Sequence, residues 1–421
     1  MDFQLPRMPQ PPAVATALSW PQLEALAAPE TDRVEGPTNA QATLRLFGQP
    51  PECVEVTLYR DHHAWCPYCQ KVWLWLEFKR IPYRIRKVTM RCYGSKEPWF
   101  LERVPSGMLP ALEFEGRLIT ESDDILAALE ARFGPLGLPM NSPEARRLRQ
   151  LERLLFQAWC LWLCRPGLVP GADRRARDQF HQIAQRFERE LQHRPGPWLD
   201  GEAPEQGPGT VDLVFVPYVE RMNASLAYYK GYDLRREHPA INAWFLALEQ
   251  RETYRGTQSD FHTHAHDLPP QMGGCWTNDS AAAQSVERLI NTGTGLGDQE
   301  ASWGDADPEL HCRVALQRVL RHRHRLLALN PLGSEGFDQP LRCALTRLVA
   351  SGQPRPERGS ALGLRYLRDR ISVPRDMPLP AGRLLRQALE ATAALDGPEQ
   401  PQRLPVRNRF DQNPTPFAMP S

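Results

Sequence analysis

The sequence predicts an α/β unit followed by an all-α region, and three observations predict it. Strand and helix patterns alternate over residues 52–137. Over residues 138–266 every long segment instead carries apolar residues at helical spacing. A Cys-Pro-Tyr-Cys motif, Cys66 to Cys69, lies where the first predicted strand passes into the first predicted helix. We therefore expect a small mixed sheet joined to a helical domain.

The elements of the α/β unit follow one another at short intervals. In chain order they are a strand at 54–60, a helix at 67–80, a strand at 84–88, a short helix at 98–103, strands at 111–114 and 118–120, and a helix at 122–133. The order βαβαββα places a βαβ unit before a hairpin and a closing helix, which makes a mixed sheet of four strands. This is the thioredoxin-like arrangement.

Helical patterns continue through most of the remaining chain. Within residues 138–266 they cover 143–164, 173–193, 212–229 and 239–252. Residues 275–395 form a helical extension of unknown role, with patterns near 281–290, 307–329, 339–350, 362–371 and 380–395. Both ends are rich in proline and are expected to be irregular. Residues 1–51 are predicted to be an accessory arm with one short helix capped by Ser19, and residues 396–421 a polar tail.

Composition limits the partners and the compartment of this 421-residue chain. Its formal net charge of +1 gives no overall field that would attract nucleic acid or an anionic membrane, so neither is an expected partner. No stretch approaches the roughly 18 consecutive apolar residues that a membrane helix needs. Nine cysteines, an odd number in no framework pattern, are typical of a reducing compartment. We expect a cytoplasmic protein without a membrane anchor.

The Cys66 to Cys69 motif carries the clearest chemistry. Cys66 is predicted at a helix N-terminus, where unpaired N–H groups and the helix dipole favour a thiolate, and Pro67 fits the first helical turn. Cys69 is either a resolving thiol or a small buried apolar residue. Two other interpretations remain. The motif is also compatible with half of a zinc site, although no second half lies downstream at the usual distance, and with an inert remnant.

Three further motifs accompany this cysteine. They are Met108-Leu109-Pro110, Glu121-Ser122-Asp123 and Gly209-Thr210-Val211-Asp212. Together with Cys66 they resemble the glutathione S-transferase superfamily over residues 54–260, about half the chain. That family joins a thioredoxin-like domain to an all-helical domain. Its members carry Ser or Thr where this chain has Gly209, a change worth only a few tenths of a kcal/mol at an N-cap.

The resemblance implies a glutathione site. Pro110 is expected to be cis, so that the main chain of Leu109 pairs with the tripeptide in the manner of strand addition. Ser122 would bind the γ-glutamyl carboxylate at a helix N-terminus, and Glu121 or Asp123 would pair with the ammonium group. Lys96 lies 14 residues before Pro110, the spacing of a lysine near the tripeptide in omega-like members. It is also compatible with a solvated surface lysine.

A cysteine in place of the usual Ser or Tyr changes the chemistry that the resemblance implies. Cysteine-type members, such as the omega and dehydroascorbate-reductase branches, form a mixed disulfide with glutathione. The string from Tyr59 to Trp65 resembles a plant and cyanobacterial subgroup. The expected function is glutathione-dependent thiol transfer to an unidentified disulfide, glutathionylated substrate or small electrophile, by a homodimer that needs no metal. Conjugation of glutathione to electrophiles and a non-catalytic interaction module are the alternatives.

Several weaker signals have two interpretations each. His63 either polarises the Cys66 thiol or is simply exposed. The alternating histidines from His262 to His266 would face one side of a strand as metal ligands, or lie in a solvent-exposed linker. The arginines near 313–325 form a basic helix that either binds an anion or pairs with the acidic stretch 298–309. Trp159 and Trp162 are either core residues or, as the resemblance implies, lie in the second-substrate pocket.

Overall fold

The computed structural model describes residues 16–167, 169–200, 207–293, 295–296, 300–303, 307–350, 352–398, 404 and 407–417. The chain divides into two compact units. The first comprises Met1–Glu30, Ala306–Ile371 and Pro380–Gln402. The second comprises Thr31–Asp305, Ser372–Leu379 and Arg403–Ser421, and it holds the Cys66 motif.

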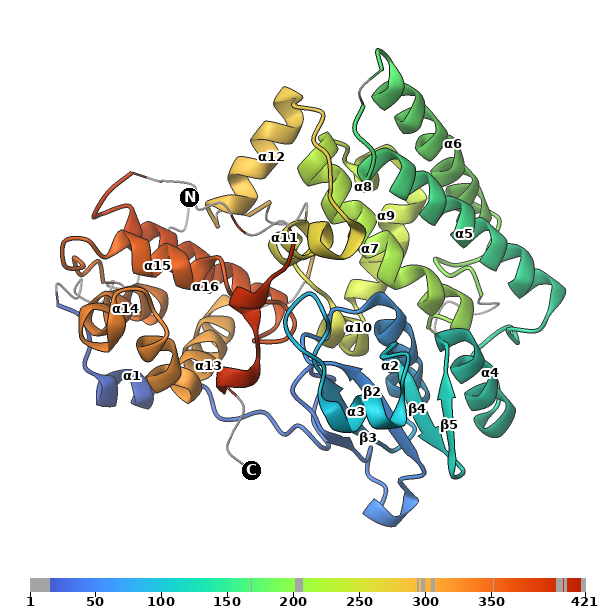
Figure 1. Cartoon of the computed structure of the whole chain (residues 1–421), viewed down its shortest axis with the longest axis horizontal. Helices are drawn as coiled ribbons and strands as arrows, with labels where there is room; N and C mark the ends of the chain where they lie inside the picture. Colours follow the sequence, from blue (N-terminus) through green and yellow to red (C-terminus); the bar gives the residue numbers. More distant parts are fainter. Residues whose placement is uncertain are drawn as a thin grey trace, which may run out of the picture. The chain divides into compact units, whose positions relative to one another are not determined.

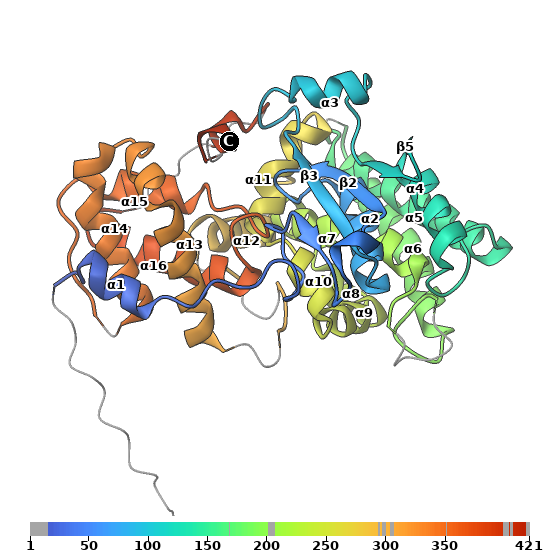
Figure 2. The same cartoon turned by 90° about the horizontal axis from the view of Figure 1, so that it is seen from below.

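A mixed sheet of five strands forms the centre of the α/β part, with the order β1-β3-β2-β4-β5. The strands are β1 (Leu44–Arg45), β2 (Val56–Asp61), β3 (Tyr83–Val88), β4 (Ala111–Phe114) and β5 (Arg117–Thr120). β2 and β3 are parallel and lie side by side in both views (Figures 1 and 2), while the other pairs are antiparallel. The thioredoxin-like prediction is confirmed. β1 was not predicted, because two residues are too short for an alternating pattern.

Three helices flank this sheet: α2 (Pro67–Lys79), α3 (Pro98–Arg103) and α4 (Ser122–Phe133). Successive residues of a strand face opposite sides of a sheet. Leu58 accordingly packs into the large core that contains residues of α2 and α4. Its neighbour Tyr59 belongs to a separate cluster with Phe100 of α3. The first turn of α2 therefore lies on the side of the sheet that meets the helical region.

The helical region of the second unit surrounds α7, which is buried along nearly its whole length. Its helices are α5 (Pro143–Leu163), α6 (Ala172–Gln192), α7 (Thr210–Lys230), α8 (Leu234–Glu237), α9 (Pro239–Glu249), α10 (Glu252–Thr257), α11 (Phe261–Met272) and α12 (Ala281–Asn291). The predicted all-α character is confirmed. Three of these helices, α8, α10 and α11, were not predicted.

Helix α11 corrects the interpretation of the alternating histidines. Residues 262–266 form neither a strand nor an exposed linker, and both His262 and His264 are buried. Asp260 caps the helix by accepting a hydrogen bond of 2.9 Å from the Thr263 N–H. This local cap favours a helix over the strand that the alternation suggested.

Gly209 precedes α7 for a steric reason. A Cβ atom at this position would lie 2.2 Å from Oδ2 of Asp200. The carboxylate of Asp212 then accepts hydrogen bonds from Gly209 N–H at 3.2 Å, Leu199 N–H at 2.9 Å and the indole N–H of Trp244 at 2.9 Å. Asp212 thus joins the start of α7 to two other segments. A side chain at position 209 would displace the carboxylate of Asp200.

The first unit contains α1 (Trp20–Leu26), α13 (Pro308–Ala328), α14 (Gly333–Val349), α15 (Ala361–Arg368) and α16 (Leu379–Ala393). The short helix predicted after Ser19 is confirmed as α1. It is not a loose arm, because the Leu18 N–H donates to Thr346 Oγ1 at 2.9 Å and the indole N–H of Trp20 donates to Asp338 at 2.7 Å.

The basic helix, α13, pairs with a different acidic segment from the one predicted. Arg321 binds Glu30 at 2.7 Å and Arg323 binds Glu24 at 2.9 Å. Part of the predicted partner stretch, 298–309, lies outside the described residues. Arg313 also donates to the Leu26 carbonyl at 3.2 Å, so the basic helix contacts several residues of the segment 24–30.

The C-terminal segment of the second unit is also more ordered than the predicted polar tail. Arg409 is buried and binds Asp267 of α11 at 2.7 Å and Asp411 at 3.1 Å.

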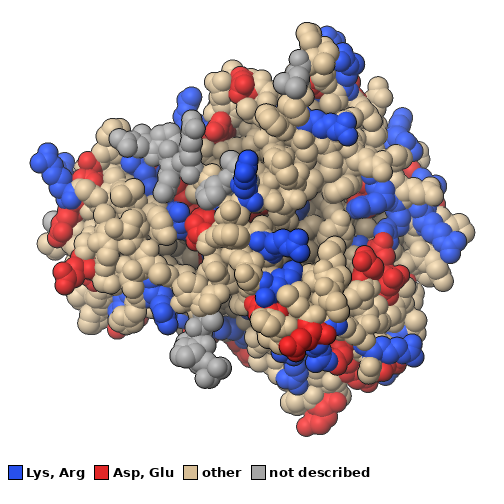
Figure 3. All heavy atoms as spheres, viewed as in Figure 1, with Lys and Arg blue, Asp and Glu red and all other residues tan. Residues whose placement is uncertain are grey.

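Among the described helices none is long and apolar enough to cross a membrane. Basic and acidic side chains are interspersed on the face shown in Figure 3. This matches the near-neutral formal charge of the chain.

Candidate active site

Cys66 is the N-cap residue of α2 and immediately follows the loop after β2. Its backbone is extended (φ −61°, ψ 122°), and Pro67 occupies the first helical position. The side chain is 6% exposed. The predicted position of this thiol is therefore confirmed, at the end of a helix where free N–H groups and the dipole favour an anion.

Cys69 lies one turn later in α2 and is 1% exposed. Burial, followed by a hydrogen bond and charge repulsion with Cys66, raises the pKa of the Cys69 thiol well above its usual value. Cys69 consequently stays protonated and acts as a hydrogen-bond donor toward the Cys66 sulfur.

Asp61 is a member of this site that sequence reasoning missed. It ends β2, is fully buried, and accepts a hydrogen bond of 2.7 Å from the Trp65 N–H through Oδ2. Its Oδ1 atom has no hydrogen-bond partner. One carboxylate oxygen and the sulfurs of Cys66 and Cys69 all lie within 4.8 Å of one another. One feature of the sequence could have pointed to Asp61: it is an acidic residue at the end of a buried strand, five residues before Cys66.

These three groups permit two kinds of chemistry. A buried carboxylate beside a thiol accepts its proton when the thiol reacts. Two sulfurs and one oxygen at this spacing also match the donor set of a soft or borderline metal ion. Among the residues that the structure describes, no other set of three potential ligands has atoms this close together.

Leu109 and Pro110 stand opposite the cysteine. Their peptide bond is cis, as predicted, and the Leu109 carbonyl oxygen lies 4.0 Å from the Cys66 sulfur. Lys96 donates to the Thr89 carbonyl at 3.2 Å. Burial lowers the pKa of Lys96, and negative charge on Cys69 and Cys66 acts in the opposite direction. This placement favours a role in the site over a solvated lysine.

Glu121 and Ser122 form the start of α4. Glu121 is the N-cap residue, is exposed and has φ 63°, while Ser122 is 6% exposed. The carboxylate of Asp123 is already paired with Lys71 and Arg149. Burial opposes ionisation, but these two cations lower the pKa of Asp123 to about 2. Of the two acids proposed for the ammonium group, only Glu121 is therefore unoccupied by such a pair among the contacts described.

Lys71 also fixes the position of this second segment. It lies in the first turns of α2 and reaches Asp123 at 2.5 Å. The start of α4 is consequently held beside the start of α2. The motifs at 66–69 and 121–123, separated in sequence, thus lie on neighbouring helix ends.

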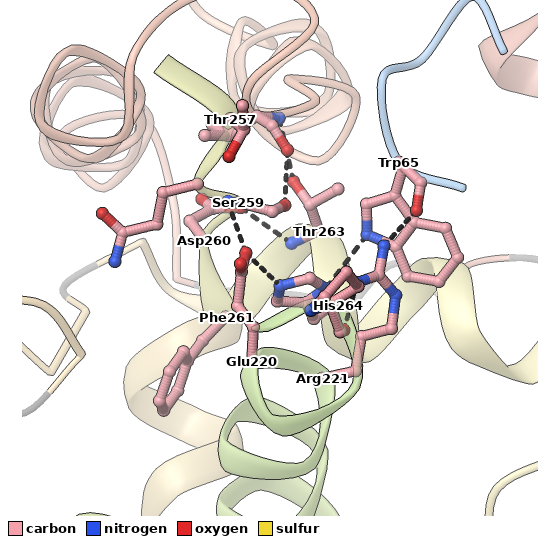
Figure 4. Close-up of polar contacts among 12 residues, drawn as sticks. Trp65, Glu220, Arg221, Thr257, Ser259, Asp260, Phe261, Thr263 and His264 are labelled. Atoms are coloured by element: carbon pink, nitrogen blue, oxygen red, sulfur yellow. Dashed lines mark hydrogen bonds and ion pairs between the residues drawn. The ribbon is translucent and has the colours of Figure 1, made fainter. Parts of the chain in front are cut away.

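A buried polar network holds the loop before Cys66 (Figure 4). The indole N–H of Trp65 donates to Nδ1 of His264 at 3.0 Å, and His264 Nε2 lies 3.0 Å from Oε1 of Glu220. The same Glu220 oxygen accepts from the Ser259 N–H at 2.7 Å. Burial lowers the pKa of His264 despite the hydrogen bond and charge of Glu220, so the ring is neutral near pH 7.

Arg221 holds the other side of the same loop. Its guanidinium donates to the Trp65 carbonyl and, at 3.1 Å, to the side chain of Gln70 in α2. It also lies 4.6 Å from the Trp65 ring centroid. Sequence reasoning missed Arg221, Glu220 and the role of His264, because the residues that they hold near Cys66, Trp65 and Gln70, lie 150 residues or more away along the chain.

His63 is not exposed, which corrects one of its two interpretations. The ring is fully buried, stacks on Tyr93 with centroids 3.5 Å apart, and places Nε2 3.0 Å from the Gln412 carbonyl. Burial, followed by the charge of Arg375, lowers the pKa of His63 well below its usual value. The C-terminal segment at 407–417 thus covers a residue that a loop position had suggested was solvated.

Trp159 and Trp162 belong to the helical core, which corrects their assignment to a second-substrate pocket. Each indole is 1% exposed. The Trp159 N–H donates to Ser225 at 3.0 Å and the Trp162 N–H donates to Asp173 at 2.9 Å. A groove on α5 is lined instead by other residues of this helix, including Phe156, Cys160 and Leu161.

Two family models match this unit. One, described as the N-terminal domain of glutathione S-transferase, matches residues 65–132. The other, described as the C-terminal domain of the same family, matches residues 170–247. The first match begins beside Cys66 and ends within α4, and therefore includes Cys66, Cys69, Lys96, Leu109, Glu121 and Ser122.

Individual proteins are similar over the same part of the chain. Glutathione S-transferase DHAR2 of Arabidopsis thaliana is 25% identical over 194 residues, 46% of this chain and 84% of that protein. Glutathione S-transferase L3 of the same plant is 25% identical over 224 residues, 52% and 89% respectively. A solved structure, glutathione transferase Omega 3C from Trametes versicolor, is 25% identical with a TM-score of 0.39, over 59% of this chain and 98% of that one. Residues 65–132 and 170–247 thus match the two domains of the glutathione S-transferase superfamily, and over about half its length the chain is similar to the DHAR proteins of plants.

Proposed function

We propose that this protein is a glutathione-dependent thiol transferase in which Cys66 carries the glutathionyl group. The family supports glutathione-dependent transfer or thiol chemistry in general. The narrower assignment rests on the nature of the N-cap residue of α2. It is a cysteine, and a second thiol donor lies directly beneath it. A thiolate attacks sulfur, whereas a hydroxyl at this position would only activate the thiol of glutathione.

Four positions form the proposed glutathione site. The main chain of Leu109, 4.0 Å from the Cys66 sulfur, would pair with the cysteinyl part of the tripeptide. The Ser122 hydroxyl and the N-terminus of α4 would bind the γ-glutamyl carboxylate. The exposed Glu121 would pair with its ammonium group, and the Lys96 ammonium would bind an anionic group close to the sulfurs.

The reaction proceeds in two exchanges of sulfur. The Cys66 thiolate attacks the glutathionyl sulfur of a mixed disulfide, so that a Cys66–glutathione disulfide forms and the substrate thiolate leaves. A second glutathione thiolate then attacks the glutathionyl sulfur on Cys66. Glutathione disulfide leaves and the Cys66 thiolate is restored. One substrate disulfide is reduced, two glutathione units become one disulfide, and the substrate thiolate takes the proton that glutathione lost.

Cys69 is a less effective nucleophile than the second glutathione in this scheme. Its thiol is buried and its raised pKa keeps it protonated at neutral pH. Attack by Cys69 would therefore require Asp61 to accept its proton. We accordingly propose a monothiol route, with Cys69 as a hydrogen-bond donor to the reacting sulfur.

The test is glutathione-dependent reduction of a small glutathione mixed disulfide by wild type, Cys66→Ser and Cys69→Ser, with and without a chelator. We expect activity to vanish with Cys66→Ser and to persist in Cys69→Ser. Unchanged activity in Cys66→Ser would exclude both thiol routes. Glutathione binding without disulfide reduction in wild type would instead support conjugation of electrophiles or an interaction module. An activity gained on metal removal would indicate that Asp61, Cys66 and Cys69 had bound an ion.

The assembly and compartment are proposed on general grounds. A homodimer is the commonest closed assembly of soluble oligomers, and we propose one here. The nine cysteines are all unpaired, which is typical of a reducing compartment such as the cytoplasm. Light scattering on the purified chain tests the first proposal directly.

A further inference from the structure

A second group of thiols lies outside the active site, at the C-terminal end of α5. Cys160 is in the last turns of α5, Cys164 is its C-cap residue, and Cys275 follows α11. All three are partly exposed. The Trp276 N–H donates to the Leu163 carbonyl at 2.8 Å. This backbone bond directly adjoins Cys164 and Cys275 and holds their two segments together.

A surface groove gives small molecules access to this group. Its volume is about 450 Å³, and its walls include Phe156, Cys160, Cys164 and Arg165. Two of the three cysteines therefore face a space that accommodates a small solute. The guanidinium of Arg165 adds a positive charge, which favours an anionic molecule.

Cys164 is the central member of the cluster. Hydrogen bonds from Cys160 and Cys275 lower the pKa of Cys164, and the charge of Lys230 adds to this effect while burial opposes it. The hydrogen bonds with Cys164 raise the pKa of the other two thiols. The cluster is thus one thiolate that accepts from two neutral thiols. A thiol with a lowered pKa on one segment and a second thiol on the segment hydrogen-bonded to it, through Leu163 and Trp276, are the arrangement that disulfide exchange requires.

Helix geometry selects the partner of Cys164. Residues four apart in a helix have Cβ atoms about 5–6 Å apart, whereas a disulfide needs about 3.5–4.5 Å. Cys160 and Cys164 are separated by one such step, so a bond between them would unwind the end of α5. Cys275 lies on a different segment and is not restricted in this way. Cys160 is left as a hydrogen-bond donor.

We propose that Cys164 and Cys275 are a second redox site, which small disulfides such as glutathione disulfide convert to an intramolecular disulfide. The Cys164 thiolate attacks one sulfur of glutathione disulfide, a Cys164–glutathione disulfide forms, and one glutathione thiolate leaves. The Cys275 thiol gives its proton to solvent and attacks the Cys164 sulfur, and the second glutathione thiolate leaves. Two protein thiols are oxidised and one small disulfide is reduced to two thiols. The step uses neither Cys66 nor Cys69.

Peptide mapping of the full-length protein tests this pairing. Wild type and Cys66→Ser are incubated with glutathione disulfide, free thiols are alkylated, and the protein is digested with trypsin without reduction. Arg165 precedes a proline and resists cleavage, so Cys160 and Cys164 stay on peptide 154–174, and Cys275 lies on peptide 256–288. We expect these two peptides to be cross-linked in both proteins, and the bond to disappear on treatment with a reducing agent.

Substitutions distinguish the three cysteines. Cys160→Ser should still form the cross-link, and Cys164→Ser and Cys275→Ser should not. Cys343→Ser, in the first unit, is the matched control and should leave it unchanged. A bond confined to peptide 154–174 in wild type, a glutathione adduct that persists on Cys164, or no oxidation at either residue would overturn the proposal. These readings come from wild type, so a variant that failed to fold would not obscure them.

Discussion

Nδ1 of His264 accepts the indole N–H of Trp65 at 3.0 Å, although 199 residues separate the two along the chain. An indole nitrogen only donates, so Nδ1 carries no proton. The proton is therefore on Nε2, which donates to Glu220 at 3.0 Å. The residue before the candidate nucleophile is thus held by one defined tautomer of a buried histidine.

Removing the histidine should loosen the loop that presents Cys66. In His264→Phe the indole N–H of Trp65 loses its buried partner, which costs about 1–3 kcal/mol, while the same oxygen of Glu220 keeps its hydrogen bond from the Ser259 N–H. We expect the free energy of unfolding, measured in urea, to fall by about 1–3 kcal/mol. We expect kcat for disulfide reduction to fall roughly tenfold, which corresponds to a rise of about 1.4 kcal/mol in the activation free energy. His264→Asn, which keeps an acceptor near Nδ1, should retain more activity than His264→Gln, which keeps only the donor to Glu220. Equal kcat in both variants would argue against the role of Trp65.

Protonation of buried histidines should work against the stability of the second unit in acid. Burial lowers the pKa of His264 and His63 below 6.5, and that of His62 to about 4. Below pH 6.5 the unfolded chain binds more protons at these residues than the folded one, so their contribution to the free energy of unfolding falls as pH decreases from 6.5 towards 4. Burial raises the pKa of Asp200 to about 7 and that of Asp212 to about 6, and these two carboxyls act in the opposite direction. Urea unfolding at a series of pH values measures this slope. It should be smaller in His264→Gln, and unchanged in the exposed control His193→Gln.

Glu121 should affect glutathione binding rather than the chemical step. If its carboxylate pairs with the γ-glutamyl ammonium group, Glu121→Gln removes a charged hydrogen bond worth about 1.5–3 kcal/mol. We expect KM for glutathione to rise by about tenfold or more while kcat changes little. Asp124→Asn, the exposed acid three positions later, is the control and should leave KM unchanged. An equal rise of KM for glutathione in both variants would instead show a general effect of negative charge at the start of α4.

Gly209 should tolerate no side chain. A Cβ atom there would lie 2.2 Å from Asp200 Oδ2, so Gly209→Ala must displace a residue that also accepts from the Leu138 N–H. Overpacking of this kind costs about 1–3 kcal/mol. Gly336→Ala, in α14, meets its nearest atom only at 3.4 Å and should be neutral or stabilise by about 0.5–1 kcal/mol. Thermal unfolding of the two variants provides the comparison.

Local patterns were sufficient for the elements that carry the recognised motifs. The predicted helix at 67–80 is α2 from Pro67 to Lys79, and the helix at 122–133 has the predicted bounds. In both cases caps and apolar spacing lie within the segment itself. The histidines of α11 were misassigned, because an alternating pattern was given more weight than the Asp260 cap.

The sequence by itself determined the fold class, the place of Cys66 at a helix N-terminus, and the cis peptide before Pro110 and the helix start at Ser122. Each depends on neighbours a few residues away, where periodicity, caps and turns act. Only the tertiary structure decided that Asp61 lies beside both sulfurs, that His264 holds Trp65, and that the segment of Cys275 is hydrogen-bonded to the end of α5. These contacts join residues from different helices, strands and loops. A buried polar group needs a hydrogen-bond partner, because burying it without one costs free energy, and the fold can supply that partner from any segment. Local sequence patterns do not show which segment supplies it.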